Sequence, residues 1–144
     1  MSEKQLTEAM GKALKVARES ETPFGAVLVN ANFKVVSAAA NSTGTDGLLA
    51  HAEMNLLSLA GAENSELSGY ILVSTCEPCP MCMGAILWHG IEKVYYGASI
   101  DDASNYMQQL QVSAKELAEK AGIKAEVQGG ILRDECIELF ESFG

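Results

Sequence analysis

Two metal-ligand motifs constrain this fold most strongly, because they lie far apart in the sequence and must meet in space to hold one ion. Glu53 follows His51 by two positions, and Cys79 and Cys82 stand three positions apart. Imidazole nitrogens and cysteine thiolates are ligands that zinc prefers in proteins. A structural zinc site closes with four protein ligands, whereas a site with three leaves its fourth position to water. The motifs therefore predict zinc bound by His51, Cys79 and Cys82, with the Glu53 carboxylate beside it as the catalytic group that moves protons.

Both motifs are expected at the beginnings of helices. Residues 80–88 are mostly apolar, with a proline at their start and Gly90 after their end, which is typical of a short helix. On its first turn the two thiols face the same point, and the helix N-terminus favours the thiolate form. Residues 50–60 carry Ala, Met and Leu in the pattern of a buried helix, so the histidine and the glutamate belong to its first turn. Two helix N-termini are expected to converge on one ion.

The rest of the chain alternates short apolar runs with helical patterns. Ser2 and Gln5 form a capping box, and apolar residues then recur at helical spacing to about Ser20. Further helices are expected to begin at Ser113 and near Leu132. The predicted strands are 24–29, 34–40, 70–75, 91–97 and 123–127, and 41–47 is predicted to be a loop. This alternation indicates an α/β layered fold.

Bulk composition narrows the class of protein and its partners. The chain has 144 residues and 48% hydrophobic content, so residues 1–144 are expected to form one domain with a core that needs no disulfides. Its formal charge of −9 disfavours nucleic acid, since that binding depends on Lys and Arg that neutralise phosphates. Neither a signal peptide nor a membrane span is evident, so we expect a cytoplasmic protein with no membrane partner.

The His-x-Glu and Pro-Cys-x-x-Cys motifs together resemble the zinc-dependent deaminases of the cytidine deaminase superfamily. Within that superfamily, residues 77–82 (Glu-Pro-Cys-Pro-Met-Cys) are similar to the branch of guanine deaminases and tRNA adenosine deaminases. The resemblance implies an α/β fold, a three-layer α/β/α sandwich with a mixed five-stranded central sheet, and it implies zinc as cofactor and a homodimer. It extends over most of the chain, through residues 23–27, Asn41, 51–53, 77–82, 84–86 and 94–97.

The resemblance also implies an activity, the hydrolytic replacement of an exocyclic amine on an aromatic ring by oxygen, with release of ammonia. It implies attack by zinc-bound hydroxide, with Glu53 as the proton shuttle. The expected substrate is a free nucleobase or related aminated heterocycle, guanine or a guanine-like base. Deamination of tRNA adenosine to inosine, and deamination of cytosine or a nucleoside, are the alternatives. A tRNA substrate requires a path of basic residues, whereas the C-terminal region is rich in Glu.

Four residues are predicted by resemblance to bind the substrate. Phe24 matches an aromatic residue that packs near the base, and Asn41 matches an amide that hydrogen-bonds the purine edge. Ala52 is expected to offer its backbone N–H to the base, and Trp88 resembles a pocket wall of guanine deaminases. Packing in the core is an equal alternative for the two aromatic residues, and a role in a turn is the alternative for the asparagine.

The segment after the predicted strand 91–97 departs from the guanine deaminase pattern. Guanine deaminases continue into a Gly-Phe-Asp-like segment, which residues 99–106 lack, so the far wall of the pocket is not defined by the resemblance. In this segment Asp101 and Asp102 are interpreted as capping or solvated carboxylates, with hydrogen bonding to a base as the alternative. The sequence assigns no role to Tyr106, and it leaves open whether the C-terminal segment is exchanged between subunits.

The cysteines and His89 also allow interpretations other than a three-ligand zinc site. The Cys-x-x-Cys pair alone is compatible with a redox motif, and Cys76 or Cys136 would be the fourth ligand of a closed zinc site. Neither interpretation gives Glu53 a role. Cys76 and Cys136 are therefore interpreted as buried core residues, and His89 as a cap at the C-terminus of its helix.

Overall fold

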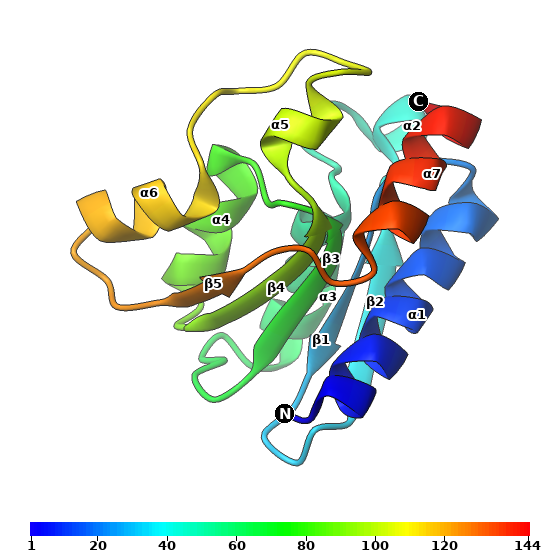
Figure 1. Ribbon diagram of the computed structural model, residues 1–144. Coiled ribbons are helices and arrows are strands. Elements are labelled where there is room, and N and C mark those ends of the chain that lie inside the picture. The colour runs from blue at the N-terminus through cyan, green and yellow to red at the C-terminus, as the bar shows by residue number, and fades with distance from the viewer.

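Five short apolar segments form one mixed β-sheet in the computed structural model, which describes residues 1–144 (Figure 1). The sheet order is β2-β1-β3-β4-β5; β1 is antiparallel to both of its neighbours, and β3, β4 and β5 run parallel. The strands are β1 (Gly25–Val29), β2 (Val35–Ala40), β3 (Ile71–Cys76), β4 (Lys93–Ala98) and β5 (Glu126–Gln128). The predicted mixed five-stranded sheet is thereby confirmed.

Helices cover both faces of this sheet, which makes three layers (Figure 1). One face packs against α1 and α7, and the other packs against α3, α4 and α6, each with its own apolar cluster. Every residue of β1 and β3 is buried, as expected for strands that are covered on both faces. The helices are α1 (Glu3–Ser20), α2 (Thr43–Asp46), α3 (Ala52–Glu63), α4 (Pro80–Trp88), α5 (Ile100–Ala103), α6 (Ala114–Lys120) and α7 (Arg133–Phe143). The helix α1 has 18 residues, and no helix is long and apolar enough to cross a membrane.

Most sequence-predicted elements are confirmed with boundaries shifted by a few residues. The capping box of Ser2 and Gln5 is present, and Ser113 caps α6. His89 caps the end of α4, where its Nδ1 lies 2.7 Å from the carbonyl oxygen of Ala85. Two helices were not predicted: α2 lies in the expected loop 41–47, and α5 follows β4. Each has only four residues, too few to show a helical period in the sequence.

A close approach of backbones fixes α1 on the sheet. A Cβ atom placed on Gly25, the first residue of β1, would collide with the carbonyl oxygen of Ala13 and lie 3.0 Å from the backbone nitrogen of Ala17. Only glycine allows the helix to lie this near the strand. Gly11 lies on the same helix, and a Cβ atom there would meet nothing within 4 Å.

We expect Gly25→Ala to lower the free energy of unfolding by about 1–3 kcal/mol, because α1 must move away from β1. The matched variant Gly11→Ala should raise it by roughly 0.5–1 kcal/mol, since alanine is the better residue in a helix interior with open space. Urea unfolding followed by circular dichroism measures both. Equal effects of the two substitutions would contradict this account of the contact.

Candidate functional site

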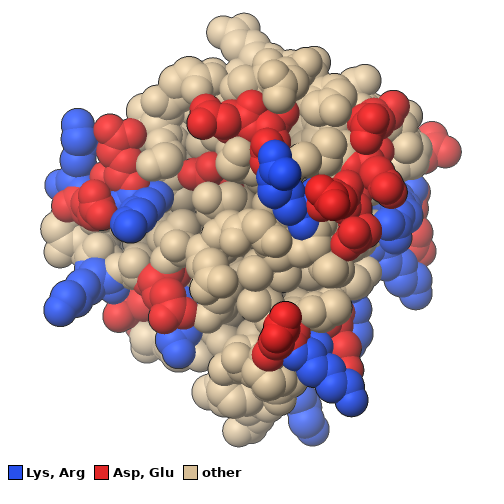
Figure 2. Space-filling view, viewed as in Figure 1, with Lys and Arg blue, Asp and Glu red and all other residues tan.

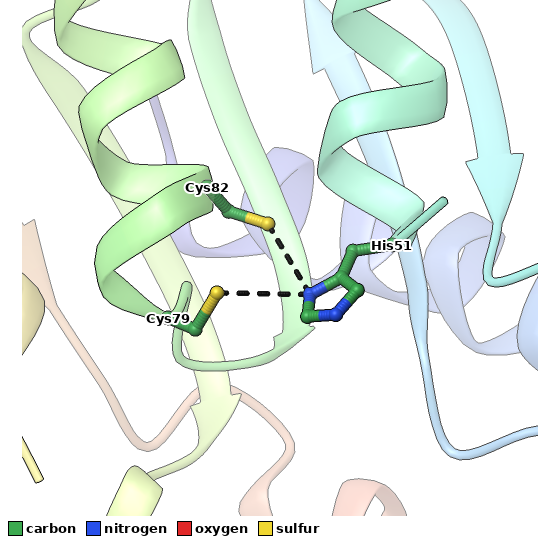
Figure 3. A group of neighbouring side chains, drawn as sticks. All are labelled: His51, Cys79 and Cys82. Carbon is green, nitrogen blue, oxygen red and sulfur yellow. Dashed lines mark hydrogen bonds between the residues drawn. The ribbon is translucent and has the colours of Figure 1, made fainter. Parts of the chain in front are cut away.

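Two helix starts bring the three predicted metal ligands together (Figure 3). His51 is the extended residue that precedes α3, Cys79 is the extended residue that precedes α4, and Cys82 lies in the first turn of α4. The Nδ1 atom of His51 is 3.6 Å from Sγ of Cys79 and 3.5 Å from Sγ of Cys82. The ligand atoms of all three residues lie within 4.8 Å of one another.

These distances fit a common ion. Tetrahedral zinc with Zn–N near 2.0 Å and Zn–S near 2.3 Å places nitrogen and sulfur about 3.5 Å apart. One imidazole nitrogen carries at most one proton, so it cannot donate to both sulfurs, whereas one ion satisfies all three groups. Neither Cys76 nor Cys136 belongs to the group. The closed four-ligand alternative is therefore wrong, and the donor set fits zinc with one position left for water.

Hydrogen bonds among the three ligand side chains shift the pKa values of the two thiols in opposite directions. A hydrogen bond from Cys82, with a further one from His51, lowers the pKa of Cys79 to about 4. The same bond, together with burial, raises the pKa of Cys82. Hydrogen bonding to Cys79 also raises the pKa of His51. The site thus favours positive charge between the three side chains, as a cation-binding centre requires.

Glu53 is buried in the first turn of α3 and lines the cavity beside the metal ligands. It is not a member of the ligand group. Burial raises the pKa of its carboxyl group to about 7. A carboxyl group with such a pKa can both accept and return a proton near neutral pH, which is the property that acid–base catalysis needs.

A cavity of about 430 Å³ opens next to this group at the end of β3, and two of the residues predicted to bind substrate, Phe24 and Asn41, line it. The Asn41 Oδ1 atom accepts hydrogen bonds from the backbone N–H and the hydroxyl of Thr43, each 3.0 Å long. Its amide NH₂ is therefore the group available to a ligand. The Phe24 ring also packs edge-on against Phe140, with centroids 5.5 Å apart, so this residue serves the core and the cavity together.

The other two residues predicted to bind substrate lie outside this cavity wall. The side chain of Ala52 is fully buried, and its N–H occupies the first position of α3, where helices provide no internal acceptor. Trp88 is 90% exposed and does not line the cavity beside the metal ligands, and it is no core aromatic either. The reason is its position at the far end of α4, about 12 Å along the helix axis from Pro80.

The sequence does not predict the residues that form the rest of the cavity wall. Met107, Gln108, Gln109 and Leu110 line the cavity, as does Phe143 of α7. These residues form no recognisable motif, and only the fold brings them to the site. In the same region Asp102 caps α5 with Ser99 and pairs with Arg133, which confirms capping and places its carboxylate outside the cavity.

The profile of the cytidine and deoxycytidylate deaminase zinc-binding region matches residues 2–98. The tRNA-specific adenosine deaminase of Bacillus subtilis is 36% identical over 141 residues, which cover 96% of this chain and 85% of that protein. The tRNA(Ile)-lysidine synthase of Deinococcus radiodurans is 38% identical over 147 residues, 96% of this chain, but the chain spans only 25% of that protein's length.

Solved structures give the same fold. The guanine deaminase of Nitrosomonas europaea superposes with a TM-score of 0.83 at 26% sequence identity, covering 95% of this chain and 83% of that one.

Removal of a ligand should abolish metal binding. We expect Cys79→Ala to lower the zinc content of the purified protein from about one ion per chain to near none, because two ligands hold zinc poorly. Elemental analysis by mass spectrometry measures this. Cys136→Ala is the matched control, since that thiol is buried away from the site and should leave the zinc content unchanged. Full zinc content in Cys79→Ala would overturn the ligand assignment.

Proposed function

Because the chain belongs to the cytidine and deoxycytidylate deaminase family, we propose that it hydrolyses the exocyclic amine of a free nucleobase, guanine or a guanine-like base, and releases ammonia. The observation that carries this proposal is the position of a buried carboxylate, Glu53, beside a three-ligand metal group at the base of a cavity. The proposal makes the protein a zinc-dependent nucleobase aminohydrolase.

The three ligands His51, Cys79 and Cys82 would hold zinc, which would supply a Lewis acid that makes water acidic enough to act as a nucleophile near neutral pH. Glu53 would carry two protons in turn: it would accept one from the attacking water and give it to the ring nitrogen, and then take the remaining hydroxyl proton and give it to the amine, which leaves as ammonia while the carbonyl forms. Its burial suits this exchange, because the pKa of about 7 leaves both protonation states accessible.

The remaining cavity residues orient the ring. The NH₂ group of Asn41 donates to an acceptor on the ring edge, since its oxygen is already bound by Thr43. Phe24 covers part of the ring face, and the Ala52 N–H at the start of α3 is a further donor. Two donors suit a ring edge that carries a carbonyl oxygen or an unprotonated ring nitrogen.

The charge of the cavity supports an uncharged substrate. None of the residues that line it is Lys or Arg, so no side chain is positioned to neutralise a phosphate. On the face shown in Figure 2, Lys and Arg are scattered among Asp and Glu and form no continuous basic path. The formal charge of −9 also disfavours a substrate that carries phosphates.

Deamination of adenosine in tRNA is the second candidate. The observation that favours it is the similarity to the tRNA-specific adenosine deaminase of Bacillus subtilis, which extends over nearly the whole chain. Both candidates share the metal site and Glu53, and they differ in whether an RNA backbone must be bound outside the cavity.

A panel of substrates separates the candidates. We expect ammonia release from guanine or a related free base with kcat/KM at least about tenfold higher than from adenosine in a tRNA anticodon stem-loop, because the cavity lacks cationic side chains. Glutamate dehydrogenase coupling measures the ammonia. A higher value for the stem-loop would replace the first candidate by the second.

The matched control for the panel is Glu53→Gln, which keeps the shape of the side chain and removes its proton transfer. We expect this variant to keep its zinc and to lose about 10²–10⁴-fold in kcat on the best substrate. Full activity of the zinc-loaded variant would refute the proposed proton shuttle.

Three broader assignments also remain proposals: one domain over residues 1–144, a cytoplasmic location and a homodimer. For the homodimer we propose the surface around Trp88, where Leu87, Leu117 and Ile123 line an apolar groove between α4 and α6. Light scattering after size exclusion should give the mass of a dimer for the native chain and of a monomer for Trp88→Arg, because a charge would be buried. A native monomer would exclude this proposal.

A further inference from the structure

Glu77 is a buried carboxylate that the proposed chemistry does not use. It lies between Cys76 and the Pro-Cys segment that carries the metal ligands. It forms no ion pair; instead, Oε1 accepts a hydrogen bond from the N–H of Ile100 and Oε2 accepts one from the N–H of Ala114, each 2.9 Å long. A buried carboxylate without a cation is costly unless its oxygens are hydrogen-bonded, so these two bonds account for its stability there.

The two donors are the first residues of different helices, α5 and α6. The first N–H groups of a helix have no acceptor within the helix. The caps Ser99 and Ser113 satisfy donors further along, the N–H groups of Asp102 and Glu116. One side chain, Glu77, therefore satisfies the first N–H of both helices.

The chain between these two helices is a wall of the cavity. We define the wall as residues 104–112, of which 107–110 line the cavity; the segment arches above the sheet in Figure 1 (yellow). Its backbone hydrogen bonds lie near its two ends: the N–H groups of Tyr106 and Met107 donate to the carbonyl oxygen of Ala103, and that of Val112 donates to the carbonyl oxygen of Leu110. In addition, Gln111 donates to the Ser104 hydroxyl, Tyr106 stacks on Phe140, and Met107 packs against the core. Leu110 is 61% exposed. The wall is thus held mainly at its two ends.

Glu77 also belongs to the opposite side of the cavity. Its own N–H donates to the carbonyl oxygen of Ala98, 2.8 Å away, which fixes its backbone to the end of β4. The adjoining residues lead directly into α4 and its two thiols. One carboxylate therefore connects the metal-ligand segment to both ends of the wall that faces it.

We propose that Glu77 is a positioning residue for substrate: it holds the wall 104–112 at a fixed distance from the metal group, so that a ring is enclosed between them. This inference rests on the proposed function, since it concerns the binding of the ring that Glu53 and zinc would act on. If only a fraction of molecules has the wall in place, the apparent dissociation constant rises by the inverse of that fraction. The catalytic groups themselves stay unchanged.

The test is Glu77→Gln in the zinc-loaded protein. Glutamine keeps one acceptor oxygen but presents an NH₂ group to the second backbone N–H, so one of the two bonds is lost. We expect amides of residues 104–112 to exchange hydrogen about tenfold faster, as mass spectrometry measures. With the best ring of the panel, KM should rise roughly tenfold and kcat should change less than about twofold.

A second variant removes the bond from the other side. Ala114→Pro deletes the N–H that Glu77 accepts, at a first helical position where proline is tolerated and after Ser113, whose extended backbone suits a following proline. It should reproduce both the faster exchange and the higher KM. Ser113→Ala is the control: it removes the cap of α6 but not the bond to Glu77, so it should lower the melting temperature and leave KM unchanged.

The measurements distinguish a failure of the role proposed for Glu77 from a failure of the proposed function. Unchanged exchange of residues 104–112 in both variants, or faster exchange with an unchanged KM, overturns the proposal. Loss of zinc in Glu77→Gln also overturns it, because Glu77 would then act on the metal segment. If the native protein deaminates no ring of the panel, the proposed function fails, while the exchange rates still decide whether Glu77 holds the wall.

Discussion

The convergence of two helix N-termini on one point is the constraint on which the rest of this structure depends. His51 and Cys79 each occupy the extended residue before a helix, and Cys82 follows within one turn. This arrangement requires α3 and α4 to lie side by side on one face of the sheet, and both pack there against the same apolar cluster. The antiparallel β1 and the parallel β3 and β4 provide the surface that holds the two helices in this relation.

The two buried carboxylates of the cavity show how local partners give one residue type two roles. Burial dominates at Glu53 and raises the pKa of its carboxyl group to about 7. Glu77 is buried as well, but the backbone N–H groups of Ile100 and Ala114 bind its two oxygens, so it links the starts of two helices. The first residue is suited to exchange protons, and the second is suited to hold structure. Their distance from the metal ligands in sequence does not distinguish them, since each lies two positions from a ligand.

Features whose signals lie close together in the sequence could be predicted from it, and features that depend on distant residues could not. Periodicity and caps predict α1, α4 and the strands, because those signals lie within the element itself. The residue types and short spacings of the two ligand motifs predict the metal group, although His51 and the two cysteines belong to the starts of different helices and only the fold brings them together. The four-residue helices carry no period, and the cavity wall of 107–110 depends on bonds from a residue far away in the chain. The resemblance that assigns Trp88 to a pocket wall does not report which end of α4 faces the cavity, and Trp88 lies at the end that is far from it.

One side of the cavity is formed by the starts of two helices, and the other side is formed by the connection 104–112. The two sides therefore differ in how well they tolerate substitutions. The metal ligands and Glu53 sit at helix starts supported by the sheet, so substitutions there disturb the core as well as the chemistry. The connection 104–112 is supported at its ends, so its middle residues can be replaced without rebuilding the layers behind them. Libraries restricted to residues 108–110, which keep Met107 on the core, are therefore the economical route to changing which ligands the cavity accepts.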